Sequence, residues 1–411
     1  SEGRRPILPP MRNRSHAVAL VMPRAAEARK ALEAEWHESI RPIRVSKWDA
    51  VASSGSMLLS HGYLLALETA MRGAMEFRYA LFTDAERGLV GVAAFQLAEF
   101  EDNGGKQSEA ACKLGVFKAR VRRELKLRAL VCGNVFHCGD HGAHFIEGFS
   151  RAEQMQALDR AMTEMMTDAR VKSKVAVRVF KELWPGDDAG ARALQGRGYH
   201  ALATDVNMLL EVDPEWRTLA GYQAALNAKS RTRLRSILQR SSDLHVHELG
   251  AEAIRANAPR MQHLLDAVVE QSPYIFGRLN VTAYAGWKEH LGDAMAVRGY
   301  SLNGELVGFS VAFANGDCLD AQFVGIDYAR NRQHAIYLRM LVDLLELAIV
   351  RGLRRVNFGR TSEQAKSGLG ALPVAMSVHV KLCGRVANAV AAPFIRRVKA
   401  AEFEQRSPFK R

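Results

Sequence analysis

Two segments about 220 residues apart share one pattern of apolar residues and turns, and this repeat constrains the fold more than any other feature. FRYALFTDAERGLVGVAAFQLAEF (residues 77–100) and MAVRGYSLNGELVGFSVAFANGDCLDAQFVGID (residues 295–327) both run strand, polar turn, Leu-Val-Gly and strand. Alternating apolar residues around a turn that carries Gly with Asp or Asn predict a β-hairpin. The spacing exceeds the roughly 20 to 50 residues of a solenoid repeat, so the pattern predicts a duplicated domain.

The second hairpin leads into a helix and a further strand. CLDAQFVGID predicts a third strand, and HAIYLRMLVDLLELAIVRG has apolar residues at helical spacing, namely Leu338, Leu341, Leu345 and Ile349. After a glycine that can cap this helix, LRRVNFG resumes as a strand. An antiparallel sheet therefore enters a right-handed parallel crossover. The predicted fold class is α/β (α+β), with a mixed sheet flanked by helices in each of two similar halves.

The net charge of the chain limits the classes of expected partner, and its cysteines indicate the cellular compartment. The chain has 57 Lys plus Arg against 44 Asp plus Glu, a formal net charge of +13, which favours an anionic partner: nucleic acid, an acidic carrier, a phosphate-bearing substrate or a membrane surface. Its five cysteines, one of them Cys112, lack CxxC spacing, which predicts reduced thiols and a cytoplasmic location. No apolar run approaches the roughly 18 residues of a spanning helix, and SEGRRPILPP lacks the hydrophobic centre of a signal peptide.

Four motifs in the second half carry a resemblance to a known family. They are KSRTRLRSILQRS, SPYIFGRL, FVGIDYARNRQHAIYLRML and NFGRTSEQAKSGLGA. Together with the order of elements over residues 295–370, they resemble the GNAT superfamily of acyltransferases. The two similar halves resemble its double-domain branch, which includes the Fem family of aminoacyl-tRNA-dependent ligases and the BioF-type acyltransferases. This resemblance implies tandem GNAT-like domains with a cleft between them.

The same resemblance gives a division of the chain. It implies a catalytic second domain joined to the first by a basic helix. The expected divisions are a flexible tail (1–35), an N-terminal GNAT-like domain (36–215), a basic linking helix (216–245), a C-terminal GNAT-like domain (246–400) and a tail (401–411).

The loop that should hold a pyrophosphate departs from the family pattern. In GNAT proteins it runs Gln or Arg, two residues, Gly, one residue, then Gly or Ala, because small residues let backbone N–H groups close on the phosphates. The matching positions are Arg330, Gln333 and Ala335, and Gln333 obstructs that approach. The resemblance implies no tightly bound cofactor, with acyl-CoA, acyl carrier protein or aminoacyl-tRNA as co-substrate. The implied donor-binding residues are Phe323, Val324, Arg330, Arg332, Gln333, His334 and Ala335.

VNFGRTSEQAKSGLG (residues 356–370) supplies cations at a strand end. We expect Arg360 and Lys366 to be exposed and to hold an anionic part of donor or acceptor, with Thr361 beside them. Because neighbouring strands carry residues 320–323 and 357–360, Asp320 is expected to orient or deprotonate the amine. The remaining candidates are Tyr337 or Tyr328 for proton transfer, Glu270 as an alternative base, Tyr328 for substrate contact and Arg278 for a carboxylate.

The basic segment NAKSRTRLRSILQRS (residues 227–241) has two interpretations. Read as a helix, it places Leu234, Ile237 and Leu238 inward and spreads its cations around the remaining surface. It is either a solvated helix that bridges the two lobes or a phosphate-contacting surface for tRNA or an acidic carrier. No aromatic residues are interleaved with the cations, which weakens the nucleic-acid interpretation.

Cysteine and histidine residues cluster in ALVCGNVFHCGDHGAHF. Such residue types bind zinc, but the first half lacks a second ligand pair, and adjacent His137 and Cys138 would point to opposite faces of a strand. We therefore predict no metal site. We expect Asn134 and His141 to lie near the groove between the lobes.

The leading functional hypothesis is a GNAT N-acyltransferase that forms an amide from a thioester donor and an amine on a small molecule or peptide. The alternative is a Fem-like aminoacyl-tRNA-dependent ligase acting on a peptidoglycan precursor or a small metabolite. A second alternative is a non-catalytic module that binds tRNA or lipid, since GRVANAVAAPFIRRVKAAEF suits peripheral contact with an anionic membrane. DNA is not an expected partner. The chain lacks GxSxG, GxxxxGK[ST], HExxH and GxGxxG, which excludes the hydrolase, NTPase, zinc protease and Rossmann classes.

Overall fold

The computed structural model describes residues 31–102, 127–203, 205–271, 274–275, 277–395, 397 and 403–410. These residues belong almost entirely to one compact unit, Leu32–Arg411. Most of the predicted N-terminal tail and Cys112 lie outside the described residues. The tail was predicted to extend to residue 35, but strand β1 (Glu33–His37) already begins at residue 33. The apolar side chains of this strand, Ala34 and Trp36, pack against a buried core.

The sheet of the first half has nine strands within the described ranges, and seven of them follow one path. The antiparallel hairpin β2–β3 lies near one end of this path, and the parallel pair β4–β6 lies in its middle. The order is β1, β2 (Glu76–Asp84), β3 (Gly88–Asp102), β4 (Leu127–Cys132), β6 (Val177–Leu183), β16 (Ser377–Leu382) and β7 (His200–Ala203). Strands β5 (Ala143–Phe145) and β10 (Tyr274–Ile275) also pair with β3.

The sheet of the second half has seven strands among the residues described. Its hairpin β11–β12 turns at Asn303 and Gly304, both with positive φ, as the Asn-Gly dipeptide predicts. The order is β9 (His245–Glu248), β11 (Met295–Leu302), β12 (Glu305–Asn315), β13 (Cys318–Ile326), β14 (Arg355–Asn357), β8 (Asn207–Glu211) and β15 (Leu372–Val374).

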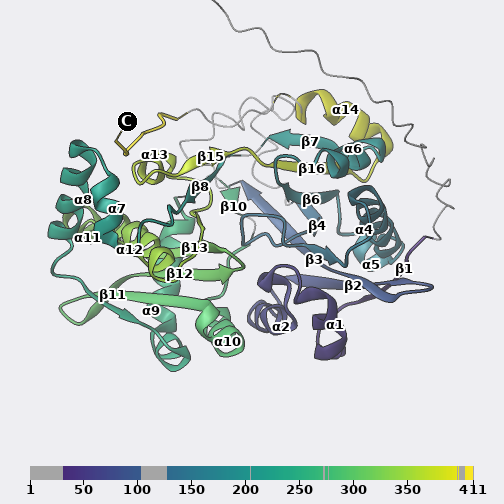
Figure 1. Cartoon of the computed structure of the whole chain (residues 1–411). Helices are drawn as coiled ribbons and strands as arrows, with labels where there is room; N and C mark the ends of the chain where they lie inside the picture. Colours follow the sequence, from purple (N-terminus) through teal and green to yellow (C-terminus); the bar gives the residue numbers. More distant parts are fainter. Residues whose placement is uncertain are drawn as a thin grey trace, which may run out of the picture. The chain divides into compact units, whose positions relative to one another are not determined.

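The seven-strand path of the first sheet has the same topology as the second sheet. Each has an antiparallel hairpin (β2–β3 and β11–β12), a third antiparallel strand (β4 and β13) and a parallel fourth strand (β6 and β14). A long helix precedes each parallel strand in the chain: α4 (Arg151–Met165) in the first half and α12 (Ile336–Val350) in the second. The prediction of duplicated α/β halves, with equivalent hairpins at equivalent sheet positions, is confirmed (Figure 1).

Strands are exchanged between the halves: the second half donates β10 and β16 to the first sheet, and the first half donates β8 to the second. Strand β8 comes before the predicted boundary at residue 215, yet it pairs antiparallel with β14 and β15 of the second sheet. Strand β16 comes from the C-terminal region and pairs with β6 and β7 of the first sheet, where its yellow arrow lies beside teal strands in Figure 1. The sheets therefore do not follow the predicted domain boundaries, and the exchange fastens the halves to each other through backbone hydrogen bonds.

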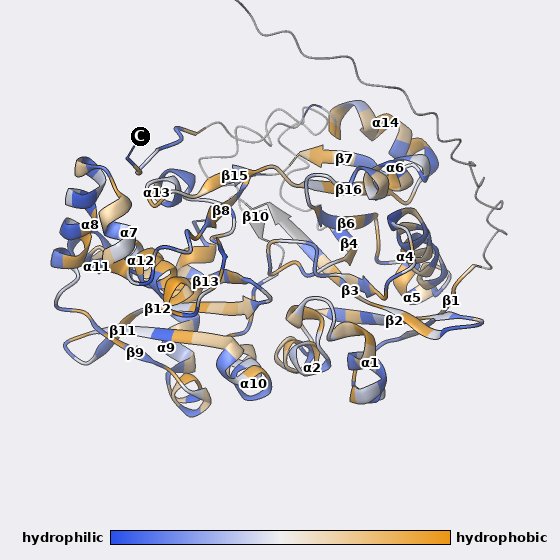
Figure 2. Cartoon of the chain, viewed as in Figure 1, coloured by the Kyte–Doolittle hydropathy of each residue, from blue (hydrophilic) through white to orange (hydrophobic). Residues whose placement is uncertain are grey.

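Helices cover the sheets according to their apolar patterns. Helix α12 is largely hydrophobic, and Leu341, Leu345 and Ile349 are buried as the periodicity predicts, whereas the basic helix α8 is largely hydrophilic (Figure 2). No helix of the described residues is long and apolar enough to cross a membrane. The other helices are α1 (Val45–Ala52), α2 (His61–Ala70), α5 (Ala169–Lys172), α6 (Asp188–Gly196), α7 (Leu219–Ala225), α8 (Ala228–Arg240), α9 (Ala251–Val269), α10 (Thr282–Leu291), α11 (Tyr328–His334), α13 (Glu363–Ser367) and α14 (Arg385–Ile395).

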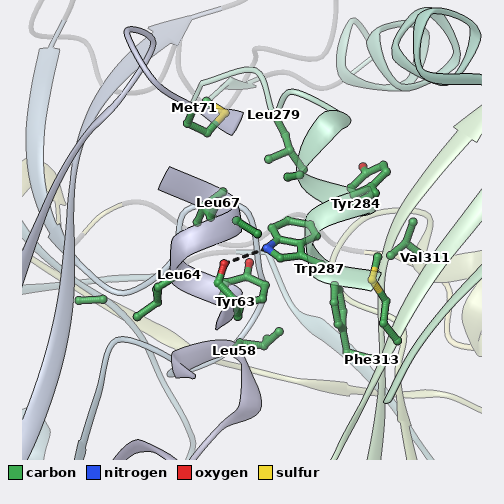
Figure 3. Close-up of a cluster of buried hydrophobic side chains, with 14 of the residues drawn as sticks. Leu58, Tyr63, Leu64, Leu67, Met71, Leu279, Tyr284, Trp287, Val311 and Phe313 are labelled. Carbon is green, nitrogen blue, oxygen red and sulfur yellow. Dashed lines mark hydrogen bonds between the residues drawn. The ribbon is translucent and has the colours of Figure 1, made fainter. Parts of the chain in front are cut away.

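One hydrophobic core extends across both halves. Tyr63 of α2 stacks on Trp287 of α10 with ring centroids 4.7 Å apart, and Phe313 of β12 meets both rings edge-on (Figure 3). The Trp287 indole also donates a hydrogen bond to the Tyr63 carbonyl oxygen (3.0 Å). All three side chains are fully buried, so this core joins α2 of the first half to α10 and β12 of the second.

The predicted C-terminal tail is packed where the structure describes it. Phe409 stacks on Trp216 and forms an isolated β-bridge with Leu226. The Asn227 N–H, at the start of α8, donates to the Pro408 carbonyl (2.9 Å), and Arg406 N–H donates to Ser367 Oγ (3.2 Å). Residues 403–410 therefore belong to the fold of the second half.

Candidate active site at the junction of the two halves

Buried polar side chains gather where the loop of residues 133–142 from the first half meets strands β13 and β14 of the second. We call this set the junction cluster. Its members are Asn134, His137, Cys138, His141, Lys181, Glu182, Asp320, Gln322, Asn357, Arg360 and Lys366. Asn134 and His141 therefore lie at the junction of the lobes, near which the sequence placed them.

Glu182 connects the two halves electrostatically. Its side chain is fully buried at the end of β6 and accepts a hydrogen bond from the Gly139 N–H (2.6 Å). It also forms ion pairs with Lys181 (2.9 Å) and with Arg360 of the second half (2.8 Å). Burial alone would raise the pKa of Glu182, but the charges of Lys181 and Arg360 lower it below the ordinary value. Glu182 is therefore ionised and holds Arg360 in place.

The prediction that Arg360 and Lys366 are exposed is wrong. Only 25% of the Arg360 side chain is exposed, and Lys366 is 3% exposed. The short helix α13 brings the Lys366 side chain back to the start of the loop that follows β14. There its ammonium donates to the carbonyl oxygens of Gly359 (3.1 Å) and Arg360 (2.6 Å). Burial lowers the pKa of Lys366 to about 8, although the neighbouring Cys138 and Glu363 favour its charged form.

This pKa predicts a rise in stability with pH. Folded Lys366 loses its proton near pH 8, whereas the unfolded chain keeps it to about 10.5, so the unfolded state binds more protons between these values. The free energy of unfolding should therefore rise by up to about 3 kcal/mol between pH 8 and 10.5 in wild type relative to Lys366→Met. Urea denaturation across this range measures the difference, and Lys229→Met at an exposed lysine is the control. A wild-type–variant difference that is independent of pH would contradict the burial of a titrating lysine.

The loop after β14 has an unusual backbone. Thr361 (φ +65°) and Ser362 (φ +54°) are both left-handed, a conformation that a β-branched residue rarely adopts and that concentrates at functional sites. Burial raises the pKa of Tyr337 to about 12, although Ser362 of this loop opposes the rise, so this tyrosine is protonated at neutral pH. Tyr328, on α11, is 43% exposed, and its electrostatic interaction with Tyr337 places it near this loop.

Asp320 occupies the position that the strand pattern predicts. It pairs with Asn357 across the parallel strands β13 and β14. Its carboxylate accepts hydrogen bonds from Asn357 Nδ2 (2.9 Å) and Asn315 Nδ2 (3.1 Å). Burial raises the pKa of Asp320, opposed first by the charge of His141 from the other half. A carboxyl group held this way suits proton exchange with a bound amine.

Strand β13 has a free edge beside this cluster. It pairs with β14 only over Cys318, Leu319 and Asp320, and from there to Ile326 no strand of the described residues pairs with it on that side. A bulge at Gln322 interrupts its pairing with β12 on the other side. Phe323 and Val324, which the resemblance implies as donor-binding residues, pair with β12 but lie beyond the part of β13 that pairs with β14.

The segment expected to be a basic, phosphate-binding loop is helix α11 instead. Arg330 forms an ion pair with Glu305 (2.6 Å) and is not directed at an open loop. The carbonyls of Arg332 and Gln333 accept hydrogen bonds from Arg240. His334 and Ala335 are buried where α11 joins α12. Asp327 caps α11 through the Ala329 N–H, which is why the chain turns helical here and does not remain a loop.

Two of the predicted residues lie apart from the buried cluster. Glu270 is exposed where α9 ends. Arg278 lies 3.8 Å from Asp266 in an ion pair, with about half of its side chain exposed. Residues 272, 273 and 276 of the motif SPYIFGRL are outside the described part of the chain.

Sequence reasoning missed Lys181 and Glu182. The signal was present in VRVFKEL, since two adjacent charges, Lys181 and Glu182, follow the alternating start of a strand. The sequence analysis considered His137, Cys138 and His141 as metal ligands, rejected a metal site and expected His141 near the groove between the lobes. They belong to an irregular loop, and the described residues contain no group of three His, Cys, Asp or Glu side chains arranged to hold a metal ion.

Comparison with known proteins gives one family match. Residues 228–367 match the model described as an acetyltransferase (GNAT) domain. No curated protein matches the chain. Similar solved structures include FemX (11% identity, TM-score 0.48, covering 84% of this chain and 96% of that one). A tandem GNAT protein from the clavulanic acid biosynthesis pathway has 13% identity and a TM-score of 0.46, with 86% and 99% covered. L-PGS from Bacillus licheniformis has 12% identity and a TM-score of 0.46, with 87% and 98% covered.

Proposed function

From the match of residues 228–367 to the acetyltransferase (GNAT) domain model, we propose that the chain is an N-acyltransferase that forms an amide. It takes the acyl group from a thioester, either acyl-CoA or an acyl carrier protein, and passes it to the amine of a small molecule or peptide. The amine attacks the thioester carbon, the new C–N bond forms, the C–S bond breaks, and the thiol leaves.

The free edge of β13 is the observation that carries this proposal. The pantetheine arm of both thioester donors is an extended chain with amide groups, and such a chain can add to a sheet edge through main-chain hydrogen bonds. The edge of β13 from Ala321 to Ile326 offers backbone N–H and C=O groups for such hydrogen bonds, and it begins directly after Asp320. An arm that runs along it would bring the thioester to the junction cluster.

The junction cluster suits the reacting groups. Asp320 orients the amine or accepts its proton, and Tyr337, which stays protonated at neutral pH, supplies a proton to the leaving thiolate. Arg360 and Lys366 stabilise negative charge on the substrate or on the tetrahedral intermediate. Lys366 with a pKa of about 8 changes charge near physiological pH, which makes the activity sensitive to pH in that range.

One observation favours aminoacyl-tRNA as the donor instead. Helix α8 exposes Lys229 and Arg235, and helix α11 takes the place of a small-residue pyrophosphate loop. A donor that carries its acyl group on RNA uses cations on a surface and does not need such a loop. The chain would then be a Fem-like ligase acting on a peptidoglycan precursor or a small metabolite.

A thermal-shift panel combined with product analysis tests these proposals. Acetyl-CoA, an acetylated acyl carrier protein and aminoacyl-tRNA are each added to the full chain, and a donor present at 100 times its Kd should raise the free energy of unfolding by about 2.7 kcal/mol. The stabilising donor is then incubated with amino acids and short peptides, and mass spectrometry detects the amide. Free coenzyme A and deacylated tRNA are the controls. Binding without any amide would favour a non-catalytic module, and an empty panel would overturn the proposal.

A further inference from the structure

Asn315, the last residue of β12, links Asp320 to the first half of the chain through its side-chain amide. The strand register places Asn315 opposite Cys318 and Phe313 opposite Asp320, and residues two apart on a strand share a face of the sheet. The side chains of Asn315 and Asp320 therefore lie on one face of the β12–β13 hairpin. There Asn315 Nδ2 donates a hydrogen bond to Asp320 Oδ2 (3.1 Å).

The other hydrogen bonds of this amide come from the first half. Asn315 Oδ1 accepts the backbone N–H of Met57 (3.0 Å), and Nδ2 also donates to Ser56 Oγ (3.1 Å). A backbone N–H can only donate, so the amide oxygen must face Met57 and the amide nitrogen must face Asp320. The start of the 3₁₀ helix η1 (Met57–Leu59) in the first half thereby fixes the orientation of the amide.

Asp320 receives one amide N–H on each of its carboxylate oxygens. While Asn315 donates to Oδ2, Asn357 Nδ2 donates to Oδ1 (2.9 Å), and the Asn357 oxygen accepts the N–H of Gly359 in the loop after β14 (3.0 Å). Cys318 Sγ lies 3.9 Å from Oδ1. An ionised carboxylate has about four acceptor sites, so it keeps capacity for the N–H groups of an amine beyond the two amide bonds.

The charged state of Asp320 depends on these two amides. Burial raises the pKa of Asp320. Four neighbours oppose this rise, two by their charge and two by their hydrogen bonds: His141, Arg355, Asn315 and Asn357. Withdrawing one amide N–H therefore favours the neutral carboxyl group, which neither accepts a proton from an amine nor attracts an ammonium group.

We propose that Asn315 is a positioning residue for acyl transfer, which fixes the Asp320 carboxylate in one orientation and stabilises its charged form while the first half is docked against it. This inference rests on the proposed function, in which Asp320 orients the amine or accepts its proton. Both roles need the ionised carboxylate. The amine still attacks the donor thioester directly, because Asn315 makes no bond to substrate in this scheme and acts only through Asp320.

A measurement without any substrate tests the effect of Asn315 on Asp320. Urea denaturation at a series of pH values gives the free energy of unfolding of wild type minus that of Asp320→Asn. This difference should fall with rising pH until the pKa of folded Asp320 is passed, because the raised pKa leaves the folded chain with more bound protons than the unfolded chain. With Asn315→Leu in both proteins, the fall should continue to about one to two pH units higher, since the carboxylate has lost a charge-assisted hydrogen bond.

Ser56→Ala is the matched control, because it removes one contact between the halves and leaves the hydrogen bonds of Asn315 to Met57 and Asp320 in place. With Ser56→Ala in both proteins, the pH at which the fall ends should not move. Asn315→Ala replaces Asn315→Leu if leucine prevents folding. An unmoved end point in the Asn315 variant, or an equal movement in Ser56→Ala, would overturn the positioning role.

The pH dependence of amide formation then relates this role to the reaction. Because the ionised carboxylate is the active form, kcat/KM should rise with pH through the pKa of Asp320, and in Asn315→Leu this rise should shift upward by the same amount as the stability end point. A shift in stability without a shift in kcat/KM would overturn the inference while the proposed function stands. If wild type forms no amide with any donor, both fail, whatever the stability measurement gives.

Discussion

Replacing Arg360 with alanine is expected to lower the free energy of unfolding by about 3–5 kcal/mol, because it leaves the buried carboxylate of Glu182 without its partner from the other half. Urea denaturation followed by fluorescence measures the change. The matched control is Arg355→Ala. Arg355 forms an ion pair with Asp317, and both side chains are more than 40% exposed, so this loss should cost about 0–1 kcal/mol.

The double variant Glu182→Gln/Arg360→Ala tests whether the stability loss comes from the unpaired charge of Glu182 or from the lost contacts of the Arg360 side chain. Because glutamine needs no counterion, the double variant should be more stable than Arg360→Ala alone. The same substitution at Arg360 should lower kcat/KM by about one to two decades if the guanidinium also meets substrate charge, since a charge-assisted contact contributes roughly 1.5–3 kcal/mol. Equal stability losses in Arg360→Ala and Arg355→Ala would rule out a buried ion pair between the halves. Full activity of Arg360→Ala would remove this arginine from the active site.

Replacing Trp287 with alanine should have an effect of similar size for a different reason. The side chain is fully buried between α10 and α2, stacks on Tyr63 and donates to the Tyr63 carbonyl (Figure 3). Removing it leaves a cavity and takes away the indole hydrogen bond, at a cost of about 3–5 kcal/mol. Differential scanning calorimetry and urea denaturation both report this loss.

Trp287→Phe is the informative companion variant. It keeps an aromatic ring against Tyr63 but removes the indole hydrogen bond and part of the volume, so it should recover a large share of the stability lost in Trp287→Ala. Val386→Ala, at a side chain that is 78% exposed, should change stability by less than about 0.5 kcal/mol. If Trp287→Ala were no more destabilising than Val386→Ala, the core that spans the two halves would not be stabilising.

Local patterns were sufficient to predict the repeated architecture. The Asn-Gly turn, the alternating apolar residues on either side of it and the helical spacing of Leu341, Leu345 and Ile349 all depend on neighbours along the chain. The hairpins and the crossover helix were therefore predictable. Placing Asp320 beside Asn357 followed from the same topology, because a parallel crossover sets consecutive strands next to each other.

Long-range pairing could not be predicted in this way. Nothing in the short strands β8 and β16 indicates that each completes the sheet of the opposite half, because a strand's pattern specifies which face is apolar but not which neighbour it pairs with. The burial of Lys366 was missed for a related reason. Its carbonyl partners, Gly359 and Arg360, lie seven and six residues earlier and reach its ammonium only when α13 folds the loop back.

The duplicated α/β halves, the mixed sheets and the basic loop after β14 follow from periodicity, turn chemistry and charge, which can be read along the chain. The ion pair of Glu182 with Arg360, the contact of Cys138 with the Gly359 loop and the electrostatic interaction of His141 with Asp320 arise only in the folded molecule. Each of these relations joins residues from different halves, more than 170 positions apart in the chain. Contacts between separate halves depend on how two complete sheets pack, and no local pattern of residues encodes that packing.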